Sequence, residues 1–228
     1  MCGNDREIYF MIQMFHVSKY YDKNYPALRD ISLEINKGDF VFVMGPSGAG
    51  KSTLLKLIFC AERADEGQIL IQGRNIARLS DSKIPYLRRN LGVVFQDYKL
   101  LQSRTIYENI AFSLKVCGVS NSEIKRRVYF VLKQVGLEHK SDTFPIRLSG
   151  GEQQRAAIAR AIVNEPTILI ADEPTGNLDY NMSVEIFEIL KDINVRGTTV
   201  IVATHNREIV SKMQRRIISL DKGKIVSN

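Results

Sequence analysis

Short runs of mostly apolar residues, many of them β-branched or aromatic, recur along the chain and predict the strands of a buried sheet. They occupy residues 39–44, 167–171, 198–204 and 216–220. Near-continuous apolar runs of this length are typical of parallel strands that are covered on both faces. Residues 67–73 instead alternate apolar and polar positions, which predicts an antiparallel strand near the edge of the fold.

Helical patterns lie between these runs. Residues 124–135 carry apolar positions at helical spacing and stop before Gly136, a residue that commonly follows the end of a helix. Residues 153–162 follow Ser149 and Glu152, whose spacing makes a capping box, and the helix is expected to stop near Pro166. A further helix is expected from Lys51 onward.

The alternation of strands and helices predicts the α/β class, with one domain of two lobes and no linker. Residues 14–95 are expected to hold antiparallel edge strands and a phosphate loop, 97–164 a mostly helical lobe, and 166–225 the remaining strands. A chain of 228 residues is long enough to bury a large core. The single domain is expected over residues 13–228, and residues 1–12 form an extension with no assigned role.

The residues after the first apolar run match the phosphate loop G-x-x-x-x-G-K-[ST] in the strand–loop–helix context that the motif requires. They are Gly45, Pro46, Ser47, Gly48, Ala49, Gly50, Lys51, Ser52 and Thr53. The glycines let backbone N–H groups point at phosphate oxygens, and the helix N-terminus adds positive charge. Lys51 is expected to reach the β- and γ-phosphates, and the Ser52 hydroxyl to bind Mg²⁺. The alternative is a chance glycine-rich turn.

Two acids, Asp172 and Glu173, follow the run at residues 167–171. Ligands of open α/β sheets bind at the carboxyl ends of the strands, so Asp172 is expected to hold Mg²⁺, directly or through water. Glu173 faces elsewhere and suits a base that orients the attacking water. A pair of solvated acids before Pro174 is the alternative, and the phosphate loop favours the functional interpretation.

Further motifs resemble those of the ATP-binding-cassette (ABC) ATPases. Residues 148–153, Leu-Ser-Gly-Gly-Glu-Gln, resemble the signature motif of that family. The other motifs follow in order: Tyr21 matches the aromatic residue that stacks on adenine, Gln96 the glutamine that meets metal and attacking water, residues 176–179 with Asp179 the D-loop, and His205 the switch histidine. The resemblance covers about residues 14–226 and implies a P-loop NTPase fold with a RecA-like core, an antiparallel β subdomain and a helical subdomain. It also implies hydrolysis of Mg·ATP to ADP and phosphate.

The signature motif implies an ATP site shared by two subunits. Ser149, Gly150, Gly151 and Glu152 open a helix whose N-terminus offers N–H groups to an anion. In the family that anion is the γ-phosphate bound by the other subunit, which implies a homodimer with ATP at its interface. An ordinary capped surface helix is the alternative, and the double glycine and the accompanying motifs decide against it.

Within this family the sequence is similar to the bacterial cell-division ATP-binding proteins called FtsE. The similarity lies in residues 95–101, 152–155, 171–179 and 203–205, and residues 97–99 are similar to those of Gram-positive members. It implies pairing with the integral membrane protein FtsX, a peripheral position on the cytoplasmic face of the cell membrane, and indirect control of a peptidoglycan hydrolase. ATPases of lipoprotein-release and macrolide-export systems share most of these motifs and remain alternatives. Asn206 stands where Asp is commoner in the family, and hydrolysis is still expected.

The charge and composition of the chain limit the classes of partner that are expected. The net charge is +7, but the basic pairs and triplets are short, dispersed and not interleaved with aromatic residues. This favours a solvated surface over a nucleic-acid site, with anionic lipid headgroups as the next alternative. DNA-repair ABC ATPases insert a long coiled coil between phosphate loop and signature, and ribosome-acting ones carry two cassettes. This chain shows neither pattern. Its three scattered cysteines suit a reducing compartment, with Cys60 and Cys117 as packing residues.

The segment after Gln96 is expected to join the nucleotide site to the helical lobe and to contact the membrane partner. Its large apolar and aromatic residues include Tyr98 and Leu100, side chains of a kind that anchors partner helices. The alternative, packing within the helical lobe, stays open for Leu101 and Ile106.

Overall fold

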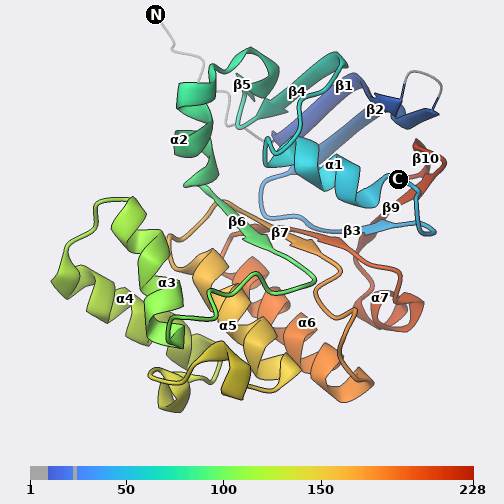
Figure 1. Ribbon diagram of the computed structural model, residues 1–228. Helices are drawn as coiled ribbons and strands as arrows, with labels where there is room; N and C mark the ends of the chain where they lie inside the picture. The colour runs from blue at the N-terminus through green and yellow to red at the C-terminus, as the bar shows by residue number, and fades with distance from the viewer. Residues whose placement is uncertain (1–9, 23–24) are drawn as a thin grey trace, which may run out of the picture.

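The computed structural model describes residues 10–22 and 25–228, which form a central sheet, a second sheet above it and helices around both (Figure 1). The central sheet holds β6 (Leu91–Val94), β7 (Ile168–Asp172), β8 (Thr199–Ala203), β3 (Phe40–Met44), β9 (Arg216–Asp221) and β10 (Lys224–Ser227). Its spatial order is β10-β9-β3-β8-β7-β6, and every pair is parallel except β9 with β10. The α/β prediction is confirmed.

The second sheet is antiparallel and has the order β2-β1-β4-β5. Its strands are β1 (Phe10–Asp22), β2 (Tyr25–Asn36), β4 (Glu66–Ile71) and β5 (Arg74–Asn75). Residues 10–12, which the sequence pattern assigned to the N-terminal extension, lie in β1, because Met11 and Ile12 are buried in the core beneath this sheet. Residues 1–9 lie outside the described part of the chain.

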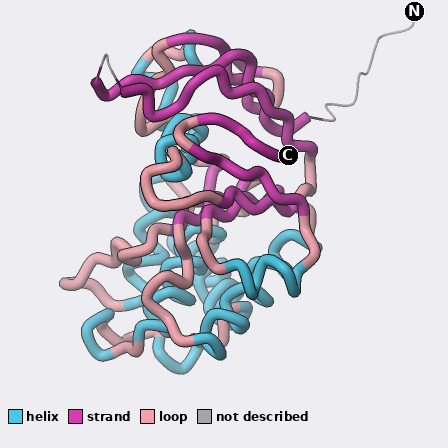
Figure 2. Tube along the Cα trace, turned by 90° about the vertical axis from the view of Figure 1, so that its right-hand side faces the viewer, coloured by secondary structure: helices cyan, strands magenta, loops and turns pink. Residues whose placement is uncertain are grey.

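Seven α-helices are found among the described residues, joined in places by short 3₁₀ turns. They are α1 (Lys51–Ile58), α2 (Ile84–Arg88), α3 (Ile106–Val116), α4 (Asn121–Gln134), α5 (Gly150–Ile162), α6 (Tyr180–Val195) and α7 (Arg207–Met213). The 3₁₀ turns are η1 (Ile76–Arg78), η2 (Asp81–Lys83), η3 (Glu138–Lys140) and η4 (Pro145–Arg147). Figure 2 shows strands gathered in the upper part of the molecule and helices in the lower part.

The apolar runs are explained by two cores, one on each face of the central sheet. In β3, Phe40 and Phe42 join the core shared with α3–α6, while Val41 and Val43 join the core shared with α1 and the antiparallel sheet. Alternate residues of β7 and β8 divide in the same way. A strand covered on both faces needs apolar side chains at every position, so its sequence shows no alternation.

Element boundaries deviate from the sequence predictions by a few residues. The strand expected over residues 67–73 ends at Ile71, because Gln72 and Gly73 both take positive φ values in the turn that follows. The helix expected from residue 153 begins at Gly150, since its cap is Ser149. Lys222 and Gly223 form the turn that joins β9 to β10.

The segment after Gln96 packs differently from the sequence expectation. Leu100 is buried in the core beneath the sheet, and Tyr98 is half-buried against the same core. Leu100 therefore does not offer a docking surface. Of the two residues left open, Ile106 is fully buried and Leu101 is exposed. Cys60 is buried, as expected, and Cys117 is half-buried.

Candidate functional site

The phosphate loop runs from the end of β3 into α1, at the carboxyl edge of the central sheet. Gly50, directly before α1, has φ 105°, and a Cβ there would lie 2.6 Å from the carbonyl oxygen of Ala27. Gly45 approaches Leu220 so closely that a Cβ would lie 2.2 Å from its carbonyl oxygen. Both positions therefore require glycine. The first N–H groups of α1 have no partner within the helix and point toward the loop.

Lys51 opens α1 and its side chain folds back over the loop. Its Nζ donates to the carbonyl oxygens of Gly45 at 2.9 Å and Pro46 at 3.2 Å, and lies 3.8 Å from Oε1 of Glu173. The side chain is largely buried. A cation enclosed by carbonyl groups and a carboxylate is well placed to meet phosphate oxygens.

Asp172, at the end of β7, lies against the start of α1. Burial raises the pKa of its carboxyl, although a hydrogen bond with the Ser52 hydroxyl acts against that rise. Its Oδ1 is buried and has no hydrogen-bond partner. An unpartnered carboxylate oxygen beside a hydroxyl fits a divalent cation such as Mg²⁺, which binds through one or two carboxylates and completes its shell with substrate phosphates and water.

Glu173 meets a different partner from Asp172, although its charge contributes to the raised pKa of Asp172. Its Oε2 lies 2.9 Å from Nδ1 of His205, and the backbone N–H of His205 donates to the same oxygen at 3.4 Å. Glu173 has φ 47°, and its own N–H donates to the carbonyl of Ala203 at 2.9 Å. The strands β7 and β8 thus bring together two residues that stand 32 positions apart.

Lys51, Glu173 and His205 share one recess of about 670 Å³, whereas Asp172 is not among the residues that line it. It is lined by residues 47–53 of the phosphate loop together with Tyr21, Ala27, Gln96, Glu173 and His205. Tyr21 lies near its mouth, about half exposed, with Nζ of Lys19 5.7 Å from the ring centroid. An exposed ring at one end and phosphate-binding groups at the other fit the length of a nucleotide.

Gln96 follows β6 and is held by the D-loop segment. The amide of Asn177 donates to the Gln96 carbonyl at 3.4 Å. A Cβ at Gly176 would lie 3.0 Å from Nε2 of Gln96, so the glycine gives the glutamine room. Asp179, expected to serve the nucleotide, caps α6 by accepting from the N–H of Met182 at 2.9 Å.

The signature residues lie outside the recess. Ser149 and Glu152 form the expected capping box, with the Ser149 N–H donating to Glu152 at 2.8 Å. This bond lowers the pKa of Glu152, and Lys140 at 3.6 Å adds to the effect. None of residues 149–152 lines the nucleotide recess. The exposed start of α5 is therefore free to meet an anion held elsewhere.

Two further residues, Gly223 and Asn206, make contacts near the site whose roles were not foreseen from the sequence. The N–H of Gly223, in the β9–β10 turn, donates to the Ala49 carbonyl at 3.1 Å and so helps to hold the phosphate loop in place. Asn206 caps α7 by accepting from the N–H of Ile209 at 3.1 Å, so the departure from Asp keeps a good cap. The Asn206 cap is a local contact, whereas a sequence pattern carries no signal for the contact between Gly223 and Ala49, which are far apart in the chain.

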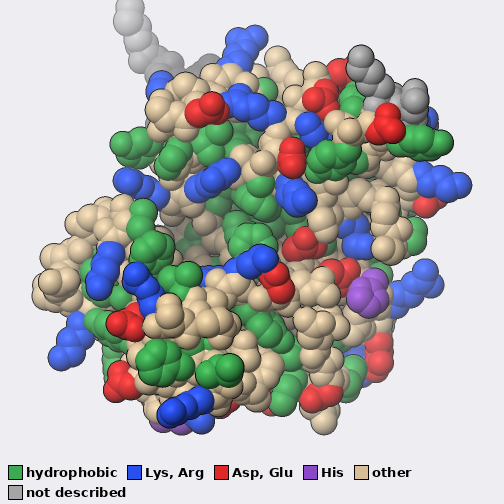
Figure 3. All heavy atoms as spheres, in the orientation of Figure 1, with side chains coloured by type: hydrophobic (Ala, Val, Ile, Leu, Met, Phe, Trp, Pro, Cys, Tyr) green, Lys and Arg blue, Asp and Glu red, His purple; other side chains and the backbone are tan. Residues whose placement is uncertain are grey.

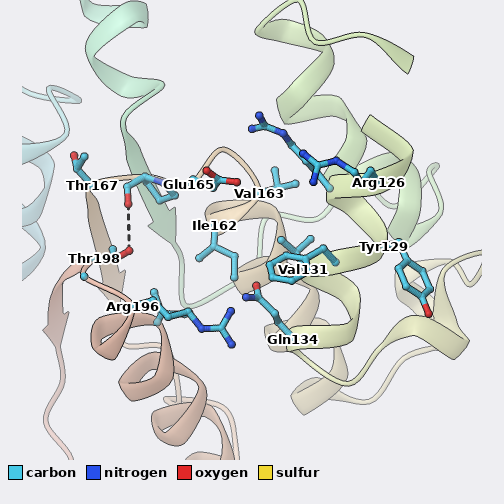
Figure 4. A pocket seen from close by; sticks show the side chains of 15 residues that line it. Arg126, Tyr129, Val131, Gln134, Ile162, Val163, Glu165, Thr167, Arg196 and Thr198 are labelled. Atoms are coloured by element: carbon cyan, nitrogen blue, oxygen red, sulfur yellow. Dashed lines mark hydrogen bonds between the residues drawn. The ribbon is translucent and has the colours of Figure 1, made fainter. Parts of the chain in front are cut away.

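A second recess, of about 700 Å³, lies between α4 and the turns that precede β7 and β8 (Figure 4). Gln134, Ile162 and Arg196 line it. It opens at the amino ends of the strands, whereas ligands of open α/β sheets bind at the carboxyl ends. It is therefore separate from the nucleotide recess. On the face drawn in Figure 3, Lys and Arg side chains are scattered among acidic and apolar ones.

A family model described as ABC transporter matches residues 28–176. The cell division ATP-binding protein FtsE of Bacillus subtilis is 53% identical over 216 residues, covering 95% of both chains. FtsE of Streptococcus pneumoniae is 50% identical, covering 95% of this chain and 94% of the relative. FtsE of Escherichia coli is 47% identical, covering 93% and 96%. The chain is an ABC ATPase of the FtsE family.

Solved structures agree with this assignment. The ABC ATPase superposes on the dimeric structure of MJ0796, a bacterial ABC transporter cassette, with a TM-score of 0.87 and 38% identity, covering 95% of this chain and 97% of that one. The same cassette is known in a post-hydrolysis state bound to ADP and Pi. A cassette from Clostridium perfringens, cbiO1, gives 0.89 with 31% identity, covering 96% and 87%, and is part of the transporter complex cbiONQ.

These likenesses confirm the predicted ABC nucleotide-binding fold, and with it an enzyme that binds and hydrolyses ATP. Across residues 10–22 and 25–228, no helix combines the length and the apolar character needed to cross a membrane.

Proposed function

We propose that this ABC ATPase powers a cell-division complex at the cytoplasmic face of the membrane, paired with an FtsX-like integral membrane subunit. Hydrolysis would be relayed through that subunit to a peptidoglycan hydrolase. The identity to FtsE proteins of several bacteria supports the division role over lipoprotein release or macrolide export. No nucleic-acid partner is proposed.

One observation carries the chemistry: the Glu173 carboxylate lies between Lys51 and His205 in a recess that Tyr21 and Gln96 also line. We assign Glu173 as the base that orients the attacking water, His205 as its partner, and Gln96 as a group that positions the water. Tyr21 stacks on adenine. The remaining nucleotide contacts come from residues 45–53, with Lys51 on the β- and γ-phosphates.

Mg²⁺ is assigned to Ser52, Asp172 and Gln96 together with the ATP phosphates. When bound, the metal neutralises charge that develops on the transferred phosphoryl group. The protein supplies the carboxylate and hydroxyl that fix its position. Mg²⁺ usually binds through one or two carboxylates together with substrate phosphates and water.

Two subunits are proposed to share each ATP. The signature residues 149–152 lie outside the recess that would hold the triphosphate, so the helix N-terminus of α5 serves a nucleotide bound by the partner. Asp179 acts with the D-loop at the same interface. The dimeric structure of a similar cassette supports this arrangement.

Glu173→Gln tests the catalytic assignment. Turnover should fall by roughly 10²–10⁴, the usual contribution of a positioned general base, while ATP binding remains. An ATP-bound dimer should accumulate and can be measured by analytical ultracentrifugation. Glu188→Gln, at an exposed position on α6, is the matched control. Hydrolysis by Glu173→Gln at the parental rate would exclude Glu173 as the base.

Copurification from membranes tests the division role. The tagged protein should retain an FtsX-like subunit after detergent extraction. Recovery of a lipoprotein-release or exporter subunit in its place would redirect the function while leaving the ATPase assignment intact.

A further inference from the structure

Arg160 joins the signature helix to the loop that carries Gln96. It lies near the end of α5, about three turns beyond Ser149. Its Nη1 donates to the Lys99 carbonyl at 2.5 Å and its Nη2 to the Tyr98 carbonyl at 2.8 Å. The guanidinium therefore binds the carbonyl oxygens of two consecutive residues shortly after Gln96.

The backbone at these two residues has a strained conformation, which the hydrogen bonds from Arg160 stabilise. Tyr98 has φ 59° and Lys99 has φ 49°, positive values that non-glycine residues adopt only at an energetic cost. The N–H of Lys99 donates to the Asp97 carbonyl at 2.6 Å, which closes a tight three-residue turn at Tyr98. The Tyr98 and Lys99 carbonyls lie close enough together for one guanidinium to bind both, and the planar fork of an arginine offers two donors in a fixed geometry that a lysine lacks.

The Arg160 guanidinium is desolvated where it makes this contact. Burial lowers the pKa of Arg160, and none of the ion pairs found in the described residues involves it. A desolvated cation whose partners are backbone carbonyls carries a large cost if those partners move away. The position of the loop and the position of α5 are therefore energetically linked.

Further contacts hold the loop of residues 96–101 in place. The Gln96 carbonyl accepts from Asn177 at 3.4 Å. The Tyr98 hydroxyl lies beside Gly150, where a Cβ would be 3.1 Å away. Tyr98 therefore touches the first residue of α5 with its side chain, while its carbonyl is held by Arg160 near the last turn. Downstream, the buried Asn109 amide holds both the N–H and the carbonyl of Leu101, at 2.7 and 3.1 Å.

We propose that Arg160 is a positioning residue for ATP hydrolysis, which makes the signature helix move as one body with the Gln96 loop. Occupancy of the nucleotide recess in one subunit then sets where α5 presents Ser149 to the nucleotide of the other. The inference rests on the proposed roles of Gln96 and of the signature motif. Arg160 itself touches neither the recess nor the signature residues.

The test compares Arg160→Met and Arg160→Lys with Arg88→Met. Arg88 is a matched control, because its guanidinium also donates to two backbone carbonyls, those of Phe59 at 3.1 Å and Cys60 at 2.8 Å, at the far end of α1. Arg160→Met should keep the Kd for ATP within about twofold and lower kcat by about 2- to 30-fold, the range of energetic coupling through linked networks. Arg160→Lys should recover part of the loss, and Arg88→Met should keep the parental kcat.

A spectroscopic readout separates positioning from simple stabilisation. The chain contains no tryptophan, so Leu101→Trp places a single reporter at an exposed position in the loop. In a Glu173→Gln background, adding Mg·ATP should shift its emission. With Arg160→Met added, the shift should fall by about half or more, and the ATP-dependent dimer should require a higher protein concentration.

An unchanged emission shift, together with a kcat for Arg160→Met equal to that of Arg88→Met, would overturn the inference. A lower Tm with both readouts unchanged would show a structural role alone and would overturn it as well. If Arg160→Met does not fold, the same comparison is made with Arg160→Lys, where an unchanged kcat and emission shift count against the proposal. Absence of hydrolysis in the Leu101→Trp protein and the parent would instead contradict the proposed function.

Discussion

Asp172 and Glu173 are sequence neighbours whose carboxylates contact different partners, and Glu173 lies in the left-handed region with φ 47°. Such a conformation costs a non-glycine residue about 1–3 kcal/mol and persists only where surrounding contacts hold it. Here the N–H of Glu173 is bound to the Ala203 carbonyl and its carboxylate to His205. The turn sends Asp172 toward Ser52 and Glu173 toward Lys51, so one acid can serve a metal and the other a water molecule.

Asp172→Asn should stabilise the nucleotide-free protein while abolishing hydrolysis. The ionised carboxylate is buried with an unpartnered oxygen, and the amide removes that charge at almost constant volume. A gain of ~1 kcal/mol would raise the Tm by about 2–4 °C in a domain of this size. Calorimetry without Mg²⁺ measures it, with exposed Asp192→Asn as control. A lower Tm for Asp172→Asn would contradict the desolvation argument.

Tyr21→Ala should weaken ATP binding without affecting folding, because the ring is about half exposed at the recess. Stacking on a base contributes roughly 1–3 kcal/mol in other contexts, so the Kd should rise about tenfold or more. Tyr25, highly exposed and outside the recess lining, gives the control Tyr25→Ala. A nucleotide titration in which only the control loses affinity would move the adenine platform to that residue.

At the scale of elements, the function proposed for α5 depends on the structure of its first turn. Its capping box holds the first turn, and Gly150 and Gly151 let neighbouring elements come close. A Cβ at Gly151 would lie 3.0 Å from the sulfur of Met182 on α6. The start of α5 is thereby anchored against α6, while its free N–H groups face outward. An ordinary capped surface helix would not need both glycines.

Ser149→Arg should leave ATP binding by the monomer intact and abolish hydrolysis, because the added bulk and charge block the approach of the other subunit. Ser120→Arg is the matched control, since Ser120 is the N-cap residue of α4. Mixing Ser149→Arg with Lys51→Ala should give mixed dimers with at most one intact shared site, and hence a partial return of activity. Full hydrolysis by either variant alone would contradict shared sites.

At the scale of the whole molecule, an exposed apolar face is found on α3 and not at Leu100. Phe112 and Val116 are 43% and 59% exposed and stand four residues apart, on the same side of the helix. The guanidinium of Arg104, from the loop after Gln96, lies 5.1 Å from the Phe112 ring centroid. This face, Phe112 and Val116, therefore adjoins the segment that Arg160 and Asn109 hold.

Phe112→Glu or Val116→Glu should lower copurification with the FtsX-like subunit while sparing ATP binding, since a charge there disrupts an apolar contact but no core packing. Phe130→Glu, a similarly exposed change on α4, should retain the subunit. Leu100→Asp should instead destabilise the fold by more than ~2 kcal/mol, because Leu100 is buried. Loss of the subunit with Phe130→Glu alone would place docking on α4.

The sequence by itself determined the chemistry and the strands. The phosphate loop, the two acids and the signature cap are local patterns, in which residue type and spacing fix backbone shape. Apolar runs such as residues 39–44 predicted β3 to within one residue, because a strand between two cores needs apolar side chains throughout. Only the tertiary structure decided that Leu100 is buried, that Arg160 grips Tyr98 and Lys99, and that Gly223 braces Ala49. These contacts join residues far apart in the chain, where no periodicity records which side chains will meet.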